Sequence, residues 1–516
     1  MSSTLFTAQL HPGRALGFLV LGASLHDILT RLKAEPQCFP RLELAYSTEN
    51  PVKEPVTVNL PANGLRLRFD GPEQRLRLVE VLDFTKNHII FKDQNTERDL
   101  VKPQTDAAGD EPTFKHIYQR FLGPTYDGEF LPSSDGQSLG VYVLSYPGVA
   151  FTFPLPESAY SPDKDVVTLL SSSTKPAASM AVFNGDSWAQ GRKSLWTEVL
   201  PSIKTFAPLA KGKDVVSDEI SLVKIHGGGK LQLFKRWTTN SVWISLGETT
   251  PQELVAELGP PDAIYRKNDQ RMYIHQIRTA SHSRTRQGGD DPRPQGDSTD
   301  TDQSSAHATS GDSDGDEAVD DDVVGNLSGE CFYNYFYLGF DVLVSAPAAP
   351  SQPPPSQEQS GLPHKIIKYS SADRLVASKL ILHGNVPGSY PFNRHRRCRW
   401  EIAYLDHASP DSSINTETAF TEIQKHLRTE WQSIYSSEAE AISKQRGMVL
   451  NRGWGDSPGS SIEFLGGWED SSAHVAQGVG PKRADGTEDS TTTLYGFPGL
   501  VFEVLKNGYV SAVTVF

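Results

Sequence analysis

The sequence predicts an α+β protein built from repeated units, in each of which a short capped helix packs on an antiparallel β-sheet. Two observations lead to this fold class. Short segments with a polar cap and apolar residues on one helical face recur along the chain, and each precedes alternating apolar and polar runs that reverse at turn residues. Long stretches without apolar periodicity separate these segments, so we expect a folded body interrupted by disordered insertions.

The first helical segment, residues 21–33, contains a capping pattern. Ser24 is followed three residues later by Asp27, and such a pair satisfies backbone N–H groups at the start of a helix. The apolar side chains that come next fall on one helical face: Leu25, Ile28, Leu29 and Leu32. This segment therefore predicts a short amphipathic helix.

A second capped segment, Pro251–Leu258, repeats this design much later in the chain. Thr250 and Glu253 supply the cap, and Pro251 occupies the first helical position, where its missing N–H costs nothing. The apolar residues stand at the same offsets from the cap as in the first segment. We therefore predict two equivalent helices that pack on equivalent sheets.

Alternating strands follow the helices and reverse at recognisable turns. Asn507-Gly508 between two alternating runs is a strong hairpin signal, because both residues tolerate positive φ. A Pro-Gly step begins further strands at Tyr146-Pro147-Gly148 and at Phe497-Pro498-Gly499. The strands predicted from these patterns include residues 65–69, 76–81, 338–344, 379–383, 500–504 and 510–516.

These elements divide the chain into up to four helix–sheet units. The units cover residues 15–92, 113–239, 240–404 and 415–516. A single unit leaves one apolar sheet face uncovered, so we expect the units to pair into one or two larger bodies. The pattern is similar to the small helix-on-sheet repeats of β-lactamase-inhibitor-like and outer-membrane-assembly lipoprotein domains, which is an analogy of fold alone.

Insertions are predicted to interrupt these units. Residues 278–328, rich in Ser, Thr, Gly and Asp, are predicted to be disordered, because they cannot bury enough apolar surface to offset their ordering entropy. The Pro-rich residues 345–364 are predicted to form an extended loop. Shorter insertions are expected at residues 93–112, 157–189 and 455–489.

The net charge of −14 is concentrated in one segment. Residues 287–328 hold twelve acids against Arg293 alone, or −11, which leaves −3 for the rest of the chain. A nucleic-acid binder normally has a basic face, so we expect no nucleic-acid partner. No apolar run reaches the roughly 20 residues of a membrane span, and no secretory signal pattern begins the chain. Three cysteines are too few for a disulfide framework or a tetrahedral zinc site, so we expect a cytoplasmic protein.

The catalytic motifs in the chain are weak. His226-Gly227-Gly228-Gly229 resembles an esterase oxyanion loop, but no G-x-S-x-G motif accompanies it, so a hairpin turn is favoured. Three acids near the first hairpin are expected to be solvated: Asp70, Glu73 and Asp83. His275 and His383 lie in apolar strands and are interpreted as core histidines. We predict no enzyme, cofactor or metal site.

A basic cluster is the main candidate site. Arg394, Arg396, Arg397 and Arg399 fall within six residues, shortly after a turn at 385–388. Because Arg makes bidentate contacts with phosphate and carboxylate, the cluster could bind a phosphoinositide headgroup or an acidic partner. The alternative is that these residues alternate along a strand and pair with acids on neighbouring strands. The sequence leaves both interpretations open.

Several motifs resemble those of the phagosome assembly factor 1 family. They are Gly64–Val81, Gly123–Tyr126, Tyr146–Gly148, Leu246–Pro261, Tyr333–Asp341, His383–Asn393 and Arg397-Cys398. The motifs occur in one order and span nearly the whole chain. The acidic linker, the Pro-rich loop and the stretch between Gly455 and Asp489 depart from the family pattern.

This resemblance implies a cytosolic, non-enzymatic scaffold or adaptor of autophagy. Family members act at the phagophore assembly site in complex with a WD40-propeller protein of the breast-carcinoma-amplified-sequence-3 type, and the propeller accounts for most of the phosphoinositide attraction. The family provides no catalytic or metal residues to transfer. The alternatives are a membrane-trafficking adaptor, a phosphoinositide-binding module, or a hydrolase, which Ser, His and Asp converging in a deep pocket would favour.

Overall fold

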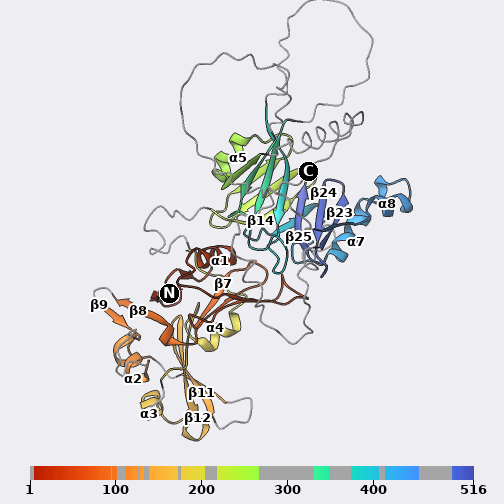
Figure 1. Ribbon diagram of the computed structural model, residues 1–516. Coiled ribbons are helices and arrows are strands. Elements are labelled where there is room, and N and C mark those ends of the chain that lie inside the picture. Colours follow the sequence, from red (N-terminus) through yellow and green to blue (C-terminus); the bar gives the residue numbers. More distant parts are fainter. Residues whose placement is uncertain are drawn as a thin grey trace, which may run out of the picture.

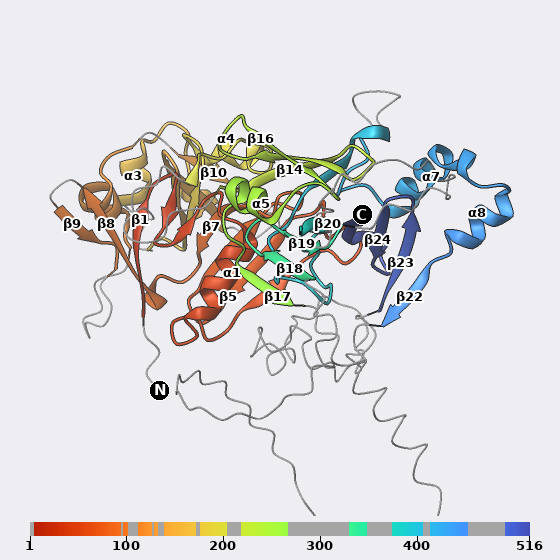
Figure 2. The same ribbon diagram turned by 90° about the horizontal axis from the view of Figure 1, so that it is seen from above.

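Two halves make up the described chain, and each has its own hydrophobic core (Figure 1). The first core draws on residues 6–203 and the second on residues 220–515. Figure 2 shows the two halves side by side, the first at the left and the second at the right. The computed structural model describes residues 5–93, 96–101, 112–125, 128–132, 139–171, 176–203, 218–266, 330–347, 374–405, 413–451 and 491–516.

The first half begins with a small sheet, a helix and a four-stranded meander. The elements are β1 (Phe6–His11), β2 (Ala15–Leu16), β3 (Leu19–Val20), α1 (Leu25–Ala34), β4 (Glu43–Ala45), β5 (Val56–Leu60), β6 (Leu65–Phe69) and β7 (Leu76–Val81). A short helical turn, η1 (Phe84–Lys86), leads to β8 (Asn87–Asp93), which pairs in parallel with β1 and is followed by β9 (Thr96–Asp99). The small sheet has the order β3-β2-β1-β8-β9.

A second helix and a second set of four strands complete this half. The elements are α2 (Phe114–His116), the π-helical turn η2 (Ile117–Phe121), β10 (Glu129–Leu131), β11 (Leu139–Tyr146), β12 (Val149–Pro156), η3 (Glu157–Ala159), α3 (Val166–Ser171), β13 (Ser179–Phe183) and α4 (Trp188–Ser194). The eight strands form one sheet of order β10-β11-β12-β13-β7-β6-β5-β4. The last strand of each set, β7 or β13, therefore lies at the sheet centre.

The second half follows the same plan. Its first part contains β14 (Ile220–Ile225), β15 (Lys230–Lys235), β16 (Ser241–Ser245), α5 (Pro251–Leu258), β17 (Ala263–Arg266), β18 (Cys331–Tyr335), β19 (Phe340–Ser345), β20 (Val376–His383) and β21 (Trp400–Ile402). Its second part contains η7 (Ala403–Leu405), α7 (Phe420–Glu430), η8 (Gln432–Ile434), α8 (Glu438–Lys444), β22 (Met448–Asn451), β23 (Thr491–Phe497), β24 (Leu500–Val504) and β25 (Val510–Val515).

The strand order is the same in both large sheets. The second sheet runs β22-β23-β24-β25-β20-β19-β18-β17, so that β25 and β20 meet at its centre as β13 and β7 do in the first. The small sheets also correspond, because β21 pairs in parallel with β14 as β8 does with β1. These parallel pairs depart from the purely antiparallel sheets that we predicted. A parallel neighbour requires a long crossover, and here a helix and six strands supply it.

The two helices predicted from capping patterns are confirmed as helices. α5 has the predicted bounds and a complete capping box between Thr250 and Glu253. α1 begins at Leu25 rather than at residue 21, because Gly22, with φ of 90°, turns the chain before the cap. Its apolar face is buried as expected: Leu25, Ile28, Leu29 and Leu32. The division into four units stays a prediction, and the expected boundary at 239 lies within the β14–β16 sheet.

The predicted hairpins are confirmed. β6 pairs antiparallel with β7, β11 with β12, and β24 with β25. β19 also pairs with β20, although a long segment separates them in sequence. Gly148 directly precedes β12 at a point where a Cβ atom would lie 2.0 Å from the backbone nitrogen of Gly13, so only glycine fits there. This close approach joins the small and large sheets of the first half.

Two of the predicted insertions contain regular structure, which corrects the sequence interpretation. Residues 93–112 include β9, and residues 157–189 include α3 and β13. β13 was missed because its apolar run is short and ends in two adjacent apolar residues, Val182 and Phe183. Residues 278–328, 455–489 and most of 345–364 lie outside the described residues.

Candidate functional site

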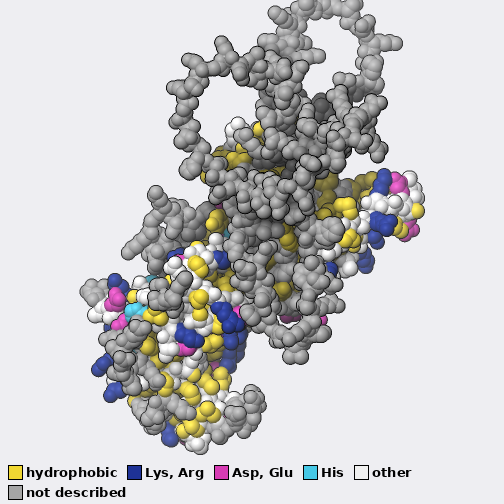
Figure 3. Space-filling model, viewed as in Figure 1, with side chains coloured by type: hydrophobic (Ala, Val, Ile, Leu, Met, Phe, Trp, Pro, Cys, Tyr) yellow, Lys and Arg dark blue, Asp and Glu magenta, His cyan; other side chains and the backbone are white. Residues whose placement is uncertain are grey.

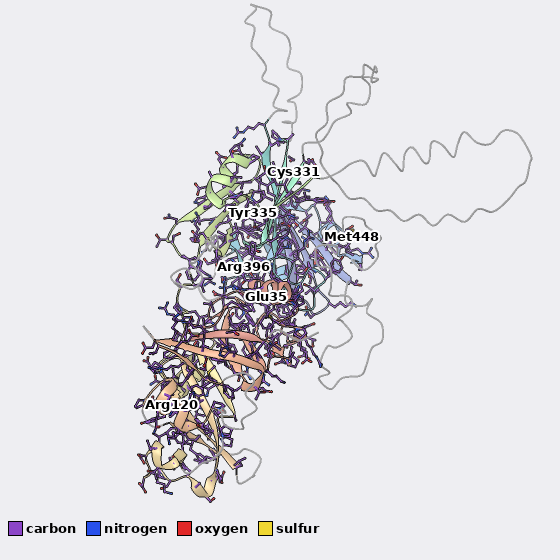
Figure 4. All side chains as sticks on the ribbon, turned by 60° about the vertical axis from the view of Figure 1, so that its left-hand side comes forward. Glu35, Arg120, Cys331, Tyr335, Arg396 and Met448 are labelled. Carbon is purple, nitrogen blue, oxygen red and sulfur yellow. The ribbon has the colours of Figure 1, made fainter. Side chains whose placement is uncertain are left out.

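The basic segment, residues 394–399, lies between β20 and β21 where the two halves meet. It is not the strand that we predicted, because the chain turns at Asn393, with φ of 62°, and β21 begins only at Trp400. The backbone N–H of Arg396 donates instead to the carbonyl of Phe336, at 2.8 Å. Figure 4 shows Arg396 in the second half, at its boundary with the first half.

Arg396 points across this boundary. It is buried, and its guanidinium lies 2.6 Å from the Asp27 carboxylate of α1 and 3.3 Å from Glu219. Burial opposes its charge, but the two carboxylates outweigh that effect and raise the pKa of Arg396. The same arrangement holds the pKa of Asp27 well below its usual range, although burial alone would raise it.

Glu219 is the central carboxylate of the junction, and it has no solvent-exposed surface. Arg75 of the first half approaches it at 2.7 Å, and Arg236 at 3.5 Å. Burial works against the ionised form, yet Arg75 and Arg396 together lower the pKa of Glu219. A buried ion pair of this kind breaks at high cost when one partner is removed.

Arg397 and Arg399 continue the network on the other side of the segment. Arg397 donates to the carbonyls of Pro72 at 2.7 Å and Gly384 at 2.6 Å, which links the first hairpin turn to the second half. Arg399 contacts Glu417 at 3.0 Å and Glu73 at 3.3 Å. The two halves are therefore joined by several buried or half-buried ion pairs, which we call the ionic junction.

The ionic junction supports the second of the two interpretations of the basic cluster, in which its arginines pair with acids. Arg396 and Arg397 are buried and hold partners inside the protein, while Arg394 and Arg399 are half-buried. Phosphoinositide contact by the cluster stays a prediction. Contact through Arg396 or Arg397 would require buried guanidinium groups to leave their internal partners. On the face shown in Figure 3, the visible Lys and Arg side chains lie over the first half and over α8, mixed with acidic and apolar ones.

The acidic partners of the junction were missed in the sequence. Asp27 was interpreted only as part of a helix cap, and indeed its backbone N–H donates to Ser24 at 3.1 Å. Asp70 and Glu73 were expected to be solvated, but Asp70 is buried 2.7 Å from Arg77 and Glu73 faces Arg236 and Arg399. No local pattern marks an acid whose partner lies hundreds of residues away.

A second cluster of polar side chains lies beside the junction. Asp341 of β19 accepts hydrogen bonds from two imidazoles, from His383 at 2.8 Å and from His395 at 2.9 Å, one on each carboxylate oxygen. The two rings stack with centroids 3.7 Å apart and planes 13° from parallel. His383 was interpreted as a core histidine, and it is half-buried in the structure.

These three residues present possible metal ligands within 4.8 Å of one another, but their geometry does not fit a shared ion. A metal bound by two histidines lies near the plane of each ring at about 2.0–2.1 Å from nitrogen. Two nearly parallel, stacked rings cannot meet this condition together. The distances to Asp341 are those of charge-assisted hydrogen bonds. We therefore interpret the cluster as a hydrogen-bonded triad.

The remaining sequence candidates lie away from this region. His226-Gly227-Gly228-Gly229 forms the turn between β14 and β15, as favoured, whereas His275 lies outside the described residues. A cavity of about 570 Å³ near α2 has a described lining without Ser, His or Asp. The residues that line it are Phe114, Lys115, Tyr118, Gln119, Pro124 and Val167.

Comparison with known proteins gives a family match over most of the chain. A family model described as Phagosome assembly factor 1 matches residues 15–290 and 367–516. The chain belongs to the phagosome assembly factor 1 family. The match covers both halves and the ionic junction, and it omits residues 291–366, which hold most of the acidic linker and the Pro-rich loop.

Relatives of the phagosome assembly factor 1 family match over similar lengths. A PHAF1 protein of Arabidopsis thaliana is 24% identical over 100% of this chain and 94% of its own length. A PHAF1 protein of Drosophila melanogaster is 22% identical over 96% of this chain and 90% of its own length. No solved structure matches the chain. Within the described residues, none of the helices has the length and apolar character needed to span a membrane.

Proposed function

We propose that this protein is a non-enzymatic scaffold of autophagy, which acts at the phagophore assembly site with a WD40-propeller partner of the breast-carcinoma-amplified-sequence-3 type. The observation that carries this proposal is the family match, which extends through both folded halves. A match confined to one half would support only a shared domain. The identity of the partner rests on the sequence resemblance.

The ionic junction supports a scaffold role. A scaffold must present its surfaces in a fixed relative orientation, and the ion pairs from Arg396 to Asp27 and from Arg75 to Glu219 cross between the halves. In this proposal the propeller provides most of the membrane attraction. The arginines best suited to bind phosphate, Arg396 and Arg397, are already held by internal partners.

Recruitment of the full-length chain in starved cells tests this function. We expect the chain to form puncta at autophagosome-forming membranes when the propeller is present, and to stay diffuse in cells that lack it. Affinity purification from the same cells should recover the propeller in a constant ratio to this chain. Puncta that persist without the propeller would contradict the proposal and indicate direct membrane recognition.

The trafficking-adaptor alternative gives a different result in the same experiment. An adaptor unrelated to autophagy would be recruited to membranes equally in fed and starved cells. A variant with Arg394 and Arg399 replaced by Ala separates out lipid contact, because these residues are half-buried and their loss disturbs the junction less than loss of Arg396. If this variant keeps its thermal stability and its puncta, the basic segment is not needed for membrane contact.

A further inference from the structure

Both ends of one segment are fastened to the same carboxylate. Residues 384–394 leave the end of β20 at His383 and return to His395, and both histidines donate to Asp341. The next residue, Arg396, carries the contacts with Asp27 and Glu219 in the ionic junction. The hydrogen-bonded triad therefore fixes the segment that holds the two halves together.

The hydrogen bonds define which nitrogen of each ring carries the proton. Each Nε2 faces a carboxylate oxygen, so each Nε2 is the donor. Nδ1 of His395 is buried and has no hydrogen-bond partner among the described residues. In neutral His395 this nitrogen is an unpaired acceptor, which carries no charge. A protonated His395 would place a buried N–H there without an acceptor, which is costly.

The surroundings of His395 also oppose a second positive charge. His383 of β20 stacks on one side, and the ring of Phe336 lies with its centroid 5.0 Å away. Arg394 and Arg396 flank His395 in the chain, and Asp341 of β19 is the anion that faces it. The pKa of His395 is lowered to about 3, mainly by burial and next by the nearby His383, despite the attraction of Asp341.

We propose that the triad of Asp341, His383 and His395 is a proton-operated latch, which holds segment 384–399 across the ionic junction while His395 is neutral and releases it when His395 takes up a proton. This inference does not depend on the proposed function. It follows from a buried nitrogen that cannot accept a proton in place, and from the position of His395 next to Arg396.

The direction of the pH effect follows from this arrangement. An imidazole freed from the latch titrates at the ordinary value of about 6.5, whereas the latched ring stays neutral far below that pH. Acid therefore favours the released segment. Between about pH 6.5 and pH 4, each unit should shift the ratio of latched to released protein by up to tenfold. Release would separate Arg396 from Asp27 and loosen the junction.

Hydrogen exchange of the full-length chain tests the latch. The amide of Arg396 donates to Phe336 and that of Cys398 donates to His383, so both report on the segment. After correction for intrinsic exchange, their protection should fall severalfold or more from about pH 7.5 to about pH 5.5. The protection of amides that pair β11 with β12 should not show this loss. Constant protection of the segment across this range would overturn the proposal.

A pair of substitutions separates His395 from other histidines. H395Q keeps an N–H that can donate to Asp341 but takes up no proton, so the pH dependence should disappear. H26Q changes a buried histidine on α1 beside Asp27 and should leave the pH dependence intact. An equal loss of protection in wild type and H395Q would contradict the latch.

A measurement on the unmodified protein covers the case in which H395Q does not fold. Selective labelling of histidine allows NMR to report the tautomer and charge of each ring. His395 should remain neutral with its proton on Nε2 in the latched state, while a released population grows in acid. A His395 ring that gains charge without any loss of segment protection would overturn the proposal.

Discussion

Gln74 and Asn385 exchange two buried hydrogen bonds across the ionic junction, one from each side-chain amide, both at 2.8 Å. Both residues also have left-handed backbones, with φ of 53° for Gln74 and 45° for Asn385. Each is therefore strained in its own turn, and the partner in the other half satisfies its side chain.

Substitutions at Asn385 should separate backbone strain from lost hydrogen bonds. Both N385G and N385A remove the side-chain amide, which leaves Gln74 Oε1 and the backbone N–H of Asn393 without their partners. An unsatisfied buried group of this kind costs about 1–3 kcal/mol. N385A should lose a further 1–2 kcal/mol, roughly, because an alanine Cβ is disfavoured at positive φ. Denaturant titration measures both. Equal stabilities for the two variants would show that the turn relaxes.

Replacing Arg396 by Ala should destabilise the protein strongly. The substitution removes the guanidinium that faces Asp27 and one of the three that face the buried Glu219. Breaking a buried ion pair in this way costs about 3–5 kcal/mol. R31A is the matched control, because its exposed pair with Glu35 at 3.9 Å contributes about 0–1 kcal/mol. A melting temperature of R396A close to that of R31A would mean that the junction adds little to stability.

The third helical residue should contribute differently to stability in α1 and α5. Asp27 in α1 and Glu253 in α5 both stand three residues after the cap. Asp27 is engaged by Arg396 from the other half, whereas Glu253 lies at the surface and only completes a capping box. D27A should therefore lower stability far more than E253A, as read from thermal melts. Similar losses in both variants would contradict the role of Asp27 in the junction.

Acid should weaken the junction through its carboxylates. The folded protein lowers the pKa of Glu219 from the ordinary value of 4.5, because Arg75 and Arg396 outweigh the effect of burial. Because the carboxyl has a lower pKa in the folded than in the unfolded protein, it stabilises the fold at pH values above its ordinary pKa. This contribution to the free energy of unfolding is lost as the pH falls below the ordinary pKa, by up to about 1.4 kcal/mol per pH unit. E219Q should be less stable at neutral pH and less sensitive below about pH 4.5. If the stability of E219Q fell with pH as steeply as that of the wild type, Glu219 would not contribute to the acid sensitivity of the protein.

Deleting residues 278–328 should leave thermal stability nearly unchanged. The flanking strands β17 and β18 pair directly, with Arg266 opposite Cys331, and a shorter connection between paired strands changes the closure entropy only logarithmically. Differential scanning calorimetry of the full-length and shortened chains provides the measurement. A melting temperature many degrees lower would show that the deleted segment packs on the folded body.

Much of the fold could be predicted from local patterns. The cap at Thr250, the turn at Asn507-Gly508 and the apolar face of α1 are short-range signals, and each element that they predicted is present. β13 gave no such signal because its apolar run is short. Its pairing with β7 depends on residues about a hundred positions away. Local periodicity cannot show which strands become neighbours.

The candidate site was located only in part. The basic cluster was found because its arginines are adjacent in sequence, but its role depends on partners in other segments. Asp27 and Arg396 are separated by 369 residues, and no composition or spacing links them. His395 lies between these arginines in the sequence, and its position there gives no sign of a hydrogen bond to Asp341. Its hydrogen bond to Asp341 depends on the turn at Asn393, which the sequence does not specify.

The central position of the last strand in each sheet has a consequence for the order of folding during synthesis. The first sheet can close once β13, ending at Phe183, has left the ribosome, because β13 joins its two sets of strands. The second sheet must wait for β25, which ends at Val515 and bridges β20 and β24. Until then β20 exposes an unpaired apolar edge, which invites aggregation. Nascent chains stalled before β25 should therefore depend on chaperones, although their first half is already folded.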